Sequence, residues 1–396
     1  MRKTSVGKAN FYDLMAAGML CLSAGSLYGW SGLSLALTDR FGLGASGVGA
    51  VFSVAILAFT VAVLISARLP DRLRGLMAGV IAAAIGACAT VLAAMASSYT
   101  AYLLCFGLGF GAASGLIYTA SLEIASESPA PGQAAPAMVA LFGMGGAVFG
   151  AAMRWLVNAG YGLWSIWPVP ASLVLACVFA LYVIVRTPPM PTASTAPSAP
   201  AAPLSVTPGT IAGLWVLFAL AATAGLTCLG LALTILADRS PLPSLAAASV
   251  FAIAIANTAG RLAVAGLTRC IRAPDIVALG CALCIVALAG LLMVEGAGRA
   301  LALLILLASG YGVIASGIPV LTRSLLQPGE FGRVFPIVLT GWGMAGFLAP
   351  GLSGQVRDAT GGFDVVLIGC LITSTLAAAI ALVFGLRLRR RVPGGL

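Results

Sequence analysis

Long runs of apolar residues, separated by short polar intervals, make up most of this chain. Each run reaches the roughly 20 helical residues needed to cross a hydrocarbon core of about 30 Å. The twelve runs are residues 11–37, 47–67, 76–96, 100–124, 135–158, 163–186, 209–235, 244–268, 276–295, 300–322, 334–356 and 363–386. None shows the short apolar–polar alternation of a transmembrane β-strand. The pattern predicts an all-α integral membrane protein with twelve transmembrane helices, because a backbone in lipid must satisfy its polar groups within each segment.

Composition and charge agree with this class and add an orientation. Of the 396 residues, 61% are hydrophobic and 8% are charged, which is far from the balance of a soluble domain. With the N-terminus inside, 15 Lys and Arg residues fall on cytoplasmic segments, and the outer loops carry five: Arg40, Arg154, Arg239, Arg299 and Arg357. The positive-inside rule therefore predicts a multi-pass protein of the plasma membrane with both termini in the cytoplasm. The same rule accounts for the net charge of +10 without a nucleic-acid partner.

A proline-rich stretch divides the apolar runs six and six. Residues 187–208 hold seven of the 21 prolines and no charged residue, a composition typical of an extended linker. We expect an N-terminal six-helix half at residues 1–186, a cytoplasmic linker at 187–208 and a C-terminal six-helix half at 209–396. In transporters built from two such repeats, the substrate site lies near the bilayer midplane between the halves.

The loop "ARLPDRLRG", residues 67–75, carries a family resemblance. It resembles the G-x-L-A-D-R-x-G-R signature that the major facilitator superfamily has between its second and third helices, with Leu69, Asp71 and Arg72 in register. The resemblance implies a cytoplasmic gate in which Asp71 contacts Arg68, Arg72 or Arg74. The alternative is that these arginines only set the topology, which leaves the lone aspartate unexplained.

Three further stretches show a narrower resemblance. They are "GSLYGWSGLSLAL" at 25–37, "PGQAAPAMVALFGMGGAVFG" at 131–150 and "FLAPGLSGQVRDATGGF" at 347–363. Together they are similar to the oxalate/formate exchanger and monocarboxylate transporter group of that superfamily. The resemblance implies secondary transport of a small organic anion by alternating access.

One basic residue stands inside an apolar run. Arg261 lies at least about 10 Å from either end of the run 244–268, at 1.5 Å per helical residue, where an arginine costs about 2.5–3.5 kcal/mol or more. Asn257 is four residues earlier and therefore projects from the same helical face. Three interpretations remain open: a structural ion pair, a side chain that snorkels to the headgroups, or a ligand for an anion.

The acids favour the last interpretation, because all eleven fall at or near helix ends and an unpaired guanidinium matches a carboxylate. In the exchanger group the arginine of N-x-x-x-R on this helix binds the substrate carboxylate, which implies the same role for Arg261. That group also uses a lysine on its eleventh helix, whereas the only lysines here are Lys3 and Lys8. With Arg261 as the only cation expected deep in the membrane, we expect a monocarboxylate rather than a compact dicarboxylate such as oxalate.

Aromatic residues near the centres of other runs are candidates for the remaining walls of the site. The candidates for substrate contact, besides Arg261 and Asn257, are Tyr28, Trp30, Tyr118, Tyr311 and Trp342. They fall on helices that line the cavity in the superfamily, although most aromatic residues in membrane helices only pack or lie at interfaces.

Several functions are disfavoured by what the sequence does not contain. It has no histidine, no mid-span acid, and Asn257 where proton-coupled carriers have Asp, so exchange or uniport is favoured over proton symport. No nucleotide loop, zinc site or catalytic triad is present, so we expect no enzyme activity, no catalytic or metal-binding residues, and no cofactor. The expected partners are the small anion and the lipid bilayer, with a monomer as the functional unit. The alternatives are a multidrug or amphiphile exporter of the same superfamily, and a non-transporting membrane receptor on the carrier fold.

Overall fold

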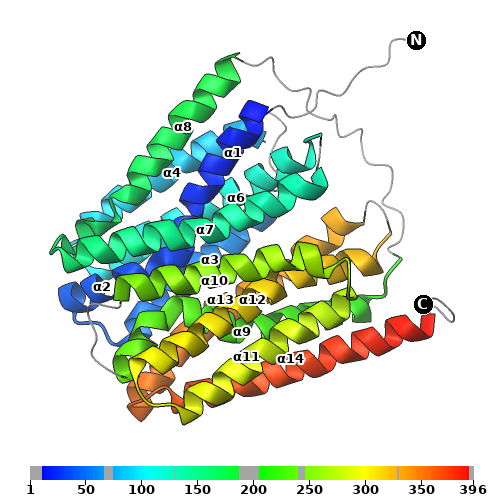
Figure 1. The fold of residues 1–396 in the computed structure, drawn as a ribbon. Helices are drawn as coiled ribbons and strands as arrows, with labels where there is room; N and C mark the ends of the chain where they lie inside the picture. The colour runs from blue at the N-terminus through cyan, green and yellow to red at the C-terminus, as the bar shows by residue number, and fades with distance from the viewer. Residues whose placement is uncertain are drawn as a thin grey trace.

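The computed structural model describes residues 11–66, 75–129, 131–186, 205–239, 246–327 and 330–391, and these residues form helices without a β-strand (Figure 1). The first six spans consist of α1 (Phe11–Ala24), η1 (Gly25–Leu33), α2 (Ser34–Phe41), α3 (Ala45–Ser66), α4 (Gly75–Ala94), α5 (Tyr99–Tyr102), η3 (Leu103–Phe110), α6 (Gly111–Ser126), α7 (Pro131–Asn158), η4 (Gly162–Ile166) and α8 (Pro168–Arg186). The last six are α9 (Pro208–Arg239), α10 (Ala246–Leu267), α11 (Ala273–Met293), α12 (Ala297–Leu325), α13 (Phe331–Thr360) and α14 (Asp364–Arg391). Within the described residues, twelve helices are long and apolar enough to cross a membrane. The prediction of twelve transmembrane helices is confirmed.

The first span is not one continuous α-helix. After α1 the chain continues as the 3₁₀ segment η1, with the sequence GSLYGWSGL, and a 3₁₀ stretch inside a helix often marks a hinge. Its three glycines, Gly25, Gly29 and Gly32, all face the backbone of α7. A methyl group at Gly29 would lie 2.6 Å from the amide nitrogen of Gly150. Small residues therefore let η1 lie directly against α7, as is usual between helices in lipid.

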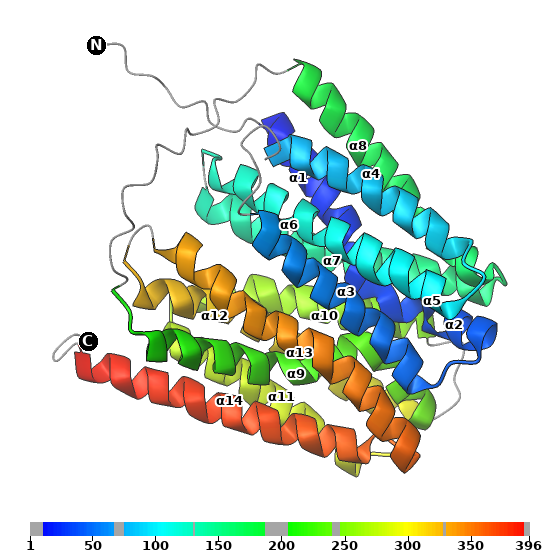
Figure 2. The same cartoon turned by 180° about the vertical axis from the view of Figure 1, so that it is seen from behind.

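The two groups of spans meet at one end of the bundle and spread toward the other. Helix α3 packs along α13, α7 packs along α10, and η1 reaches α9 and α10, whereas α1 packs mainly against helices of its own group. In Figures 1 and 2 the groups diverge toward the end where α1 begins and α14 ends. We call this end the termini end and the opposite one the far end.

A carboxylate fastens the two groups at the far end. Asp358, near the end of α13, accepts hydrogen bonds from the main-chain amides of Ala45 at 3.0 Å and Ser46 at 2.9 Å, in the first turn of α3. These amides have no partner within their own helix. Beside Asp358, Arg357 pairs with Asp238 of α9 at 2.7 Å. Asp358 thus caps a helix that belongs to the other group of spans.

Two sequence predictions fall outside the described residues. The proposed gate residues Arg68, Asp71, Arg72 and Arg74 all belong to segment 67–74, and most of the linker 187–208 belongs to segment 187–204.

Candidate functional site

Arg261 of α10 is buried, with 8% of its surface exposed, and Asn257 one turn earlier is 0% exposed. The Arg261 Nε donates to Oδ1 of Asn257 at 3.4 Å, so the predicted shared face of the two side chains is present. A second nitrogen, Nη2, donates to the hydroxyl of Tyr28 in η1 at 3.4 Å. The guanidinium carbon also lies 5.4 Å from the centre of the Tyr28 ring, within the range of a cation–π interaction. Arg261 therefore bridges the last six spans to the first six.

The charge of Arg261 is not neutralised by any side chain that the structure describes. No ion pair joins it to a carboxylate among the described residues, and its contacts are a neutral amide and phenolic side chains. The Nδ2 of Asn257 is also buried and has no hydrogen-bond partner among the described residues. Buried polar groups are usually satisfied, and burial of a charge is costly unless it is paired. The site therefore presents unused donors beside an uncompensated positive charge, which is the chemistry of an anion site.

Six aromatic side chains form a connected group that reaches this charge through Tyr28, and we call them the aromatic cluster. They are Tyr28 from η1, Phe59 from α3, Tyr118 from α6, Phe142 from α7, Tyr311 from α12 and Trp342 from α13. The ring centres of Tyr28 and Phe142 are 5.1 Å apart, and those of Phe59 and Trp342 are 5.5 Å apart. Four of the five aromatic residues predicted from the sequence thus belong to one cluster.

Polar groups of the aromatic cluster are directed to one another and to Arg261. Nε1 of Trp342 donates to the hydroxyl of Tyr311 at 2.8 Å. Tyr118 and Tyr311 lie close enough to the guanidinium to interact with it electrostatically. The cluster therefore combines apolar ring faces with phenolic oxygens around one cation.

Glycines fix the positions of these side chains by close helix approach. A methyl group at Gly225 of α9 would overlap the ring of Tyr311, and one at Gly146 of α7 would lie 2.7 Å from Cβ of Tyr28. A methyl group at Gly312 of α12 would overlap the carbonyl oxygen of Asn257 and lie 3.0 Å from the amide nitrogen of Arg261. The backbones of three helices thus lie directly against the site.

Trp30, the fifth predicted aromatic residue, lies elsewhere. It is fully buried within the first six spans, with its ring centre 5.0 Å from Phe106 and 6.0 Å from Tyr102. Its Nε1 has no hydrogen-bond partner among the described residues. The structure therefore brings Trp30 together with other rings rather than with Arg261.

Sequence reasoning missed two members of the cluster and placed one cation wrongly. Phe59 and Phe142 were not predicted, because a phenylalanine in an apolar helix carries no distinguishing signal. Arg154 was assigned to an outer loop, but it lies inside α7 and is 3% exposed. Arg261 is therefore not the only buried cation among the described residues, although Arg154 lies only four residues before the end of α7.

No metal centre is visible among the described residues, where His, Cys, Asp and Glu never gather in groups of three or more. All nine cysteines are free thiols, and Cys281 and Cys284 are buried within α11.

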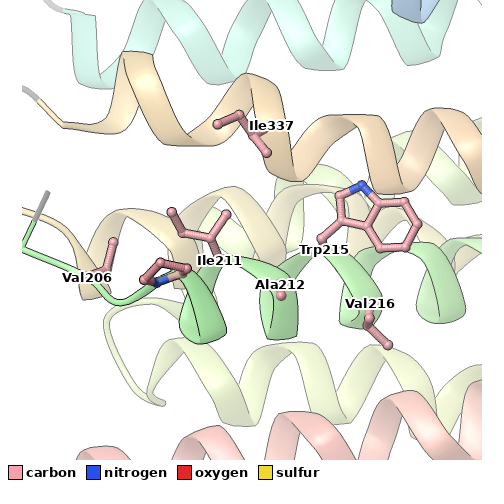
Figure 3. Close-up of a pocket in the computed structure, with 7 residues that line it drawn as sticks. Val206, Ile211, Ala212, Trp215, Val216 and Ile337 are labelled. Atoms are coloured by element: carbon pink, nitrogen blue, oxygen red, sulfur yellow. The ribbon is translucent and has the colours of Figure 1, made fainter.

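A separate apolar pocket of about 550 Å³ lies at the termini end. It is lined by Val206, Pro208, Ile211, Ala212, Trp215, Val216 and Ile337. In Figure 3, Ile337 of α13 faces the side chains of α9 across the pocket. Arg261 and the aromatic cluster do not contribute to its lining.

Hydrogen bonds to Glu330 fasten the chain beside this pocket. The main-chain nitrogen of Ser205 donates to Glu330 at 2.6 Å, the Ser205 hydroxyl donates to the other carboxylate oxygen, and the amide of Gln327 donates at 2.9 Å. These bonds hold the pKa of Glu330 below its ordinary value, and the bond from the Ser205 hydroxyl has the largest effect. The start of α9 is thereby tied to the start of α13.

Comparison with known proteins identifies the fold. No family model matches the sequence, and no curated protein matches it. Among solved structures, a bacterial homologue of the human lysosomal transporter Spinster, inward-facing and unoccupied, matches with a TM-score of 0.74 and 14% identity, over 97% of this chain and 98% of that one. The inward-facing and occupied form of such a homologue matches with a TM-score of 0.71 and 14% identity, over 94% and 96% of the two chains. A mutant of the nucleoside transporter NupG matches with a TM-score of 0.70 and 14% identity, over 94% and 99%.

Proposed function

We propose that this chain, which has the twelve-helix fold of major facilitator transporters, moves a small monocarboxylate across the membrane by alternating access. The observation that carries the proposal is the buried guanidinium of Arg261, held by Asn257 and Tyr28 where the two groups of spans meet. No carboxylate among the described residues neutralises it. A planar two-donor group in that setting is suited to the carboxylate of a substrate.

The geometry around Arg261 favours one carboxylate on an apolar body. The other buried cation, Arg154, lies eleven residues beyond Gly143 along α7, which is about 16 Å at 1.5 Å per residue. Since Gly143 approaches Arg261 itself, that spacing is too long for both carboxylates of a molecule as small as oxalate. The aromatic cluster supplies ring faces for the rest of the substrate.

The site favours exchange or uniport over proton symport. The chain has no histidine, and none of the acids in its described part forms an ion pair with Arg261. A proton relay needs a group at the site that gains and loses a proton in the working pH range. In exchange, one substrate carboxylate replaces another at Arg261, entering alternately from the two sides of the membrane. The charge of Arg261 would then remain compensated without a proton.

The charge distribution supports a plasma-membrane protein with cytoplasmic termini. In that orientation the termini end is the cytoplasmic end, and the spread of the two groups of spans corresponds to an inward-facing state. We propose that segment 67–74, with Asp71 and its neighbouring arginines, closes this end in the opposite state, and that the monomer carries the whole cycle.

The apolar pocket beside Trp215 favours a second candidate, an exporter of amphiphiles. Its lining holds no charged residue, and Val216 and Ile337 are exposed. A carrier of this kind would take hydrophobic compounds from the membrane and would not need Arg261. The two candidates therefore differ in their dependence on that residue.

A counterflow experiment in proteoliposomes tests the proposal with formate, L-lactate, L-phenyllactate and oxalate. We expect L-phenyllactate to exchange best and oxalate worst, because the site combines one cation with a cluster of aromatic rings. Arg261→Ala should lower transport efficiency about 100-fold, the effect of losing a charge-assisted carboxylate contact. Arg261→Lys keeps the charge but loses the planar fork, so it should retain partial activity.

Arg269→Ala is the matched control, because Arg269 is exposed just beyond the end of α10. It should transport like the wild type. Equal counterflow of L-phenyllactate by the wild type and Arg261→Ala would refute the proposal, and export of amphiphiles by Arg261→Ala would support the second candidate.

A further inference from the structure

Arg154 is a second buried cation to which the proposed mechanism assigns no role. It lies in α7, four residues before the helix ends at Asn158, and 3% of its surface is exposed. Its Nε and Nη1 are buried and have no hydrogen-bond partner among the described residues. Asp39 of α2 interacts with it electrostatically, but the two form no ion pair in the described part of the chain.

A purely structural role does not explain this environment. Buried guanidinium groups are normally paired and hydrogen-bonded, since unpaired burial is costly. A snorkelling arginine would hold its charged end in water, whereas this one is almost completely covered. Donors that are retained at such a cost indicate a partner that is present in another step of the protein's cycle.

The position of Arg154 on α7 shows where that partner would come from. Gly143 and Gly150 face α10: a methyl group at Gly143 would lie 2.8 Å from Oγ1 of Thr258, and one at Gly150 would lie 2.6 Å from Cγ1 of Val250. Eleven residues are close to three full turns, so Arg154 projects from nearly the same face as Gly143. It therefore continues the stripe of α7 that faces α10, about 16 Å from the level of Arg261 toward the far end.

We propose that Arg154 is a second anion-binding residue, which receives the substrate carboxylate at the far end before it reaches Arg261. The proposal rests on the proposed function, because alternating access requires the far ends of α7 and α10 to separate. Separation uncovers Arg154 and gives its free donors a carboxylate partner. When the far end closes again, the anion has moved to Arg261, and Arg154 is covered as it is here.

Transport measured separately from the two membrane faces tests this role. Exchange of radiolabelled L-phenyllactate is followed in right-side-out and inside-out membrane vesicles, for the wild type, Arg154→Gln and Arg299→Gln. For L-phenyllactate supplied on the membrane side of the far end, Arg154→Gln should raise the half-saturating concentration about tenfold. For L-phenyllactate supplied on the side of the termini end, the change should be less than about twofold. Arg299 is an exposed arginine at the same end, and Arg299→Gln should match the wild type at both faces.

A chemical measurement on the wild-type protein does not depend on transport or on the folding of an Arg154 variant. Purified wild type is treated with the arginine reagent 4-hydroxyphenylglyoxal, with and without L-phenyllactate, and modification is located by mass spectrometry. We expect Arg154 to react, and L-phenyllactate to reduce its reaction at least about threefold without protecting Arg299. The same protection should persist in Arg261→Ala, because the two cations are separate.

The outcomes distinguish this inference from the proposed function. Unchanged transport in Arg261→Ala would contradict the proposed function, whatever Arg154 does. Loss of transport in Arg261→Ala, together with wild-type behaviour of Arg154→Gln or an equal loss at both faces, would overturn the role of Arg154 alone. Failure of Arg154 to react, or reaction without protection by L-phenyllactate, would also overturn it.

Discussion

At the scale of single residues, the burial of Arg261 is the central energetic feature of the site. An arginine in the middle of a membrane costs about 2.5–3.5 kcal/mol on insertion scales. Its hydrogen bonds to Asn257 and Tyr28 are long, at 3.4 Å each, and a cation–π contact contributes about 0.5–2 kcal/mol. These neutral contacts orient the guanidinium without cancelling its charge. A bound carboxylate would complete the compensation, which links the stability of the site to its occupancy.

Asn257→Asp tests this compensation by placing a carboxylate beside Arg261. In its ionised form the new aspartate pairs with the guanidinium and competes with the substrate, whereas its protonated form leaves Arg261 free. An aspartate is ionised throughout the range from about pH 5.5 to about 8, and an adjacent cation favours the ionised form further, so exchange of L-phenyllactate by the variant should be about tenfold slower than in the wild type across this range. The measurement is the initial exchange rate at several pH values in this range, and a wild-type rate in the variant would contradict the idea.

Individual residues also show how far the sequence could predict the site. Arg261 and Asn257 were predictable, because a charge in an apolar run is costly and a spacing of four puts both side chains on one helical face. Phe59 and Phe142 were not, since only the packing of α3 and α7 distinguishes them from other apolar residues. Arg154 was misplaced because a charge near the end of a run looks like a loop residue until its burial is known.

At the scale of helices, the packing of α10 against α12 holds the site in place. Gly260 of α10 lies against the carbonyl of Ser309, and Gly312 of α12 lies against the carbonyl of Asn257. The 49 glycines of the chain predict close packing in general. They do not predict which glycines meet which helix, because that depends on helix rotation and crossing, which many distant contacts determine together.

Gly312→Ala should disturb the site without changing a residue that is proposed to contact the substrate. A methyl group there would overlap the Asn257 carbonyl, so α12 must move away, and overpacking of this kind costs about 1–3 kcal/mol. We expect the half-saturating concentration of L-phenyllactate to rise about tenfold. Gly298→Ala is the control, because position 298 in the first turn of α12 has open space around it. Wild-type transport by Gly312→Ala would show that this contact does not position Arg261 and Asn257.

At the scale of the whole molecule, topology and conformation differ in how well the sequence predicts them. The twelve helices were predictable, because the bilayer thickness sets their length and composition. Which end of the bundle is closed was not, since the proposed alternating access requires two arrangements of one sequence with similar free energies. The closed far end depends on contacts between distant segments, such as Asp358 with the first turn of α3. Asp358 gave no signal of that role beyond its position near a helix end.

Asp358→Ala should weaken closure of the far end. The variant loses two charge-assisted bonds to a helix N-terminus, where the helix dipole also favours a negative charge. A lost cap of this kind costs about 1 kcal/mol, or about a fivefold change in the ratio of closed to open far ends. Hydrogen–deuterium exchange of the peptide that contains Ala45 and Ser46 measures the effect, and exchange should be several-fold faster in the variant. Glu295→Ala removes an exposed acid at the same end and should leave this exchange unchanged. If both variants exchange at the wild-type rate, closure is determined by the packing of α3 against α13, and the Asp358 cap follows from it.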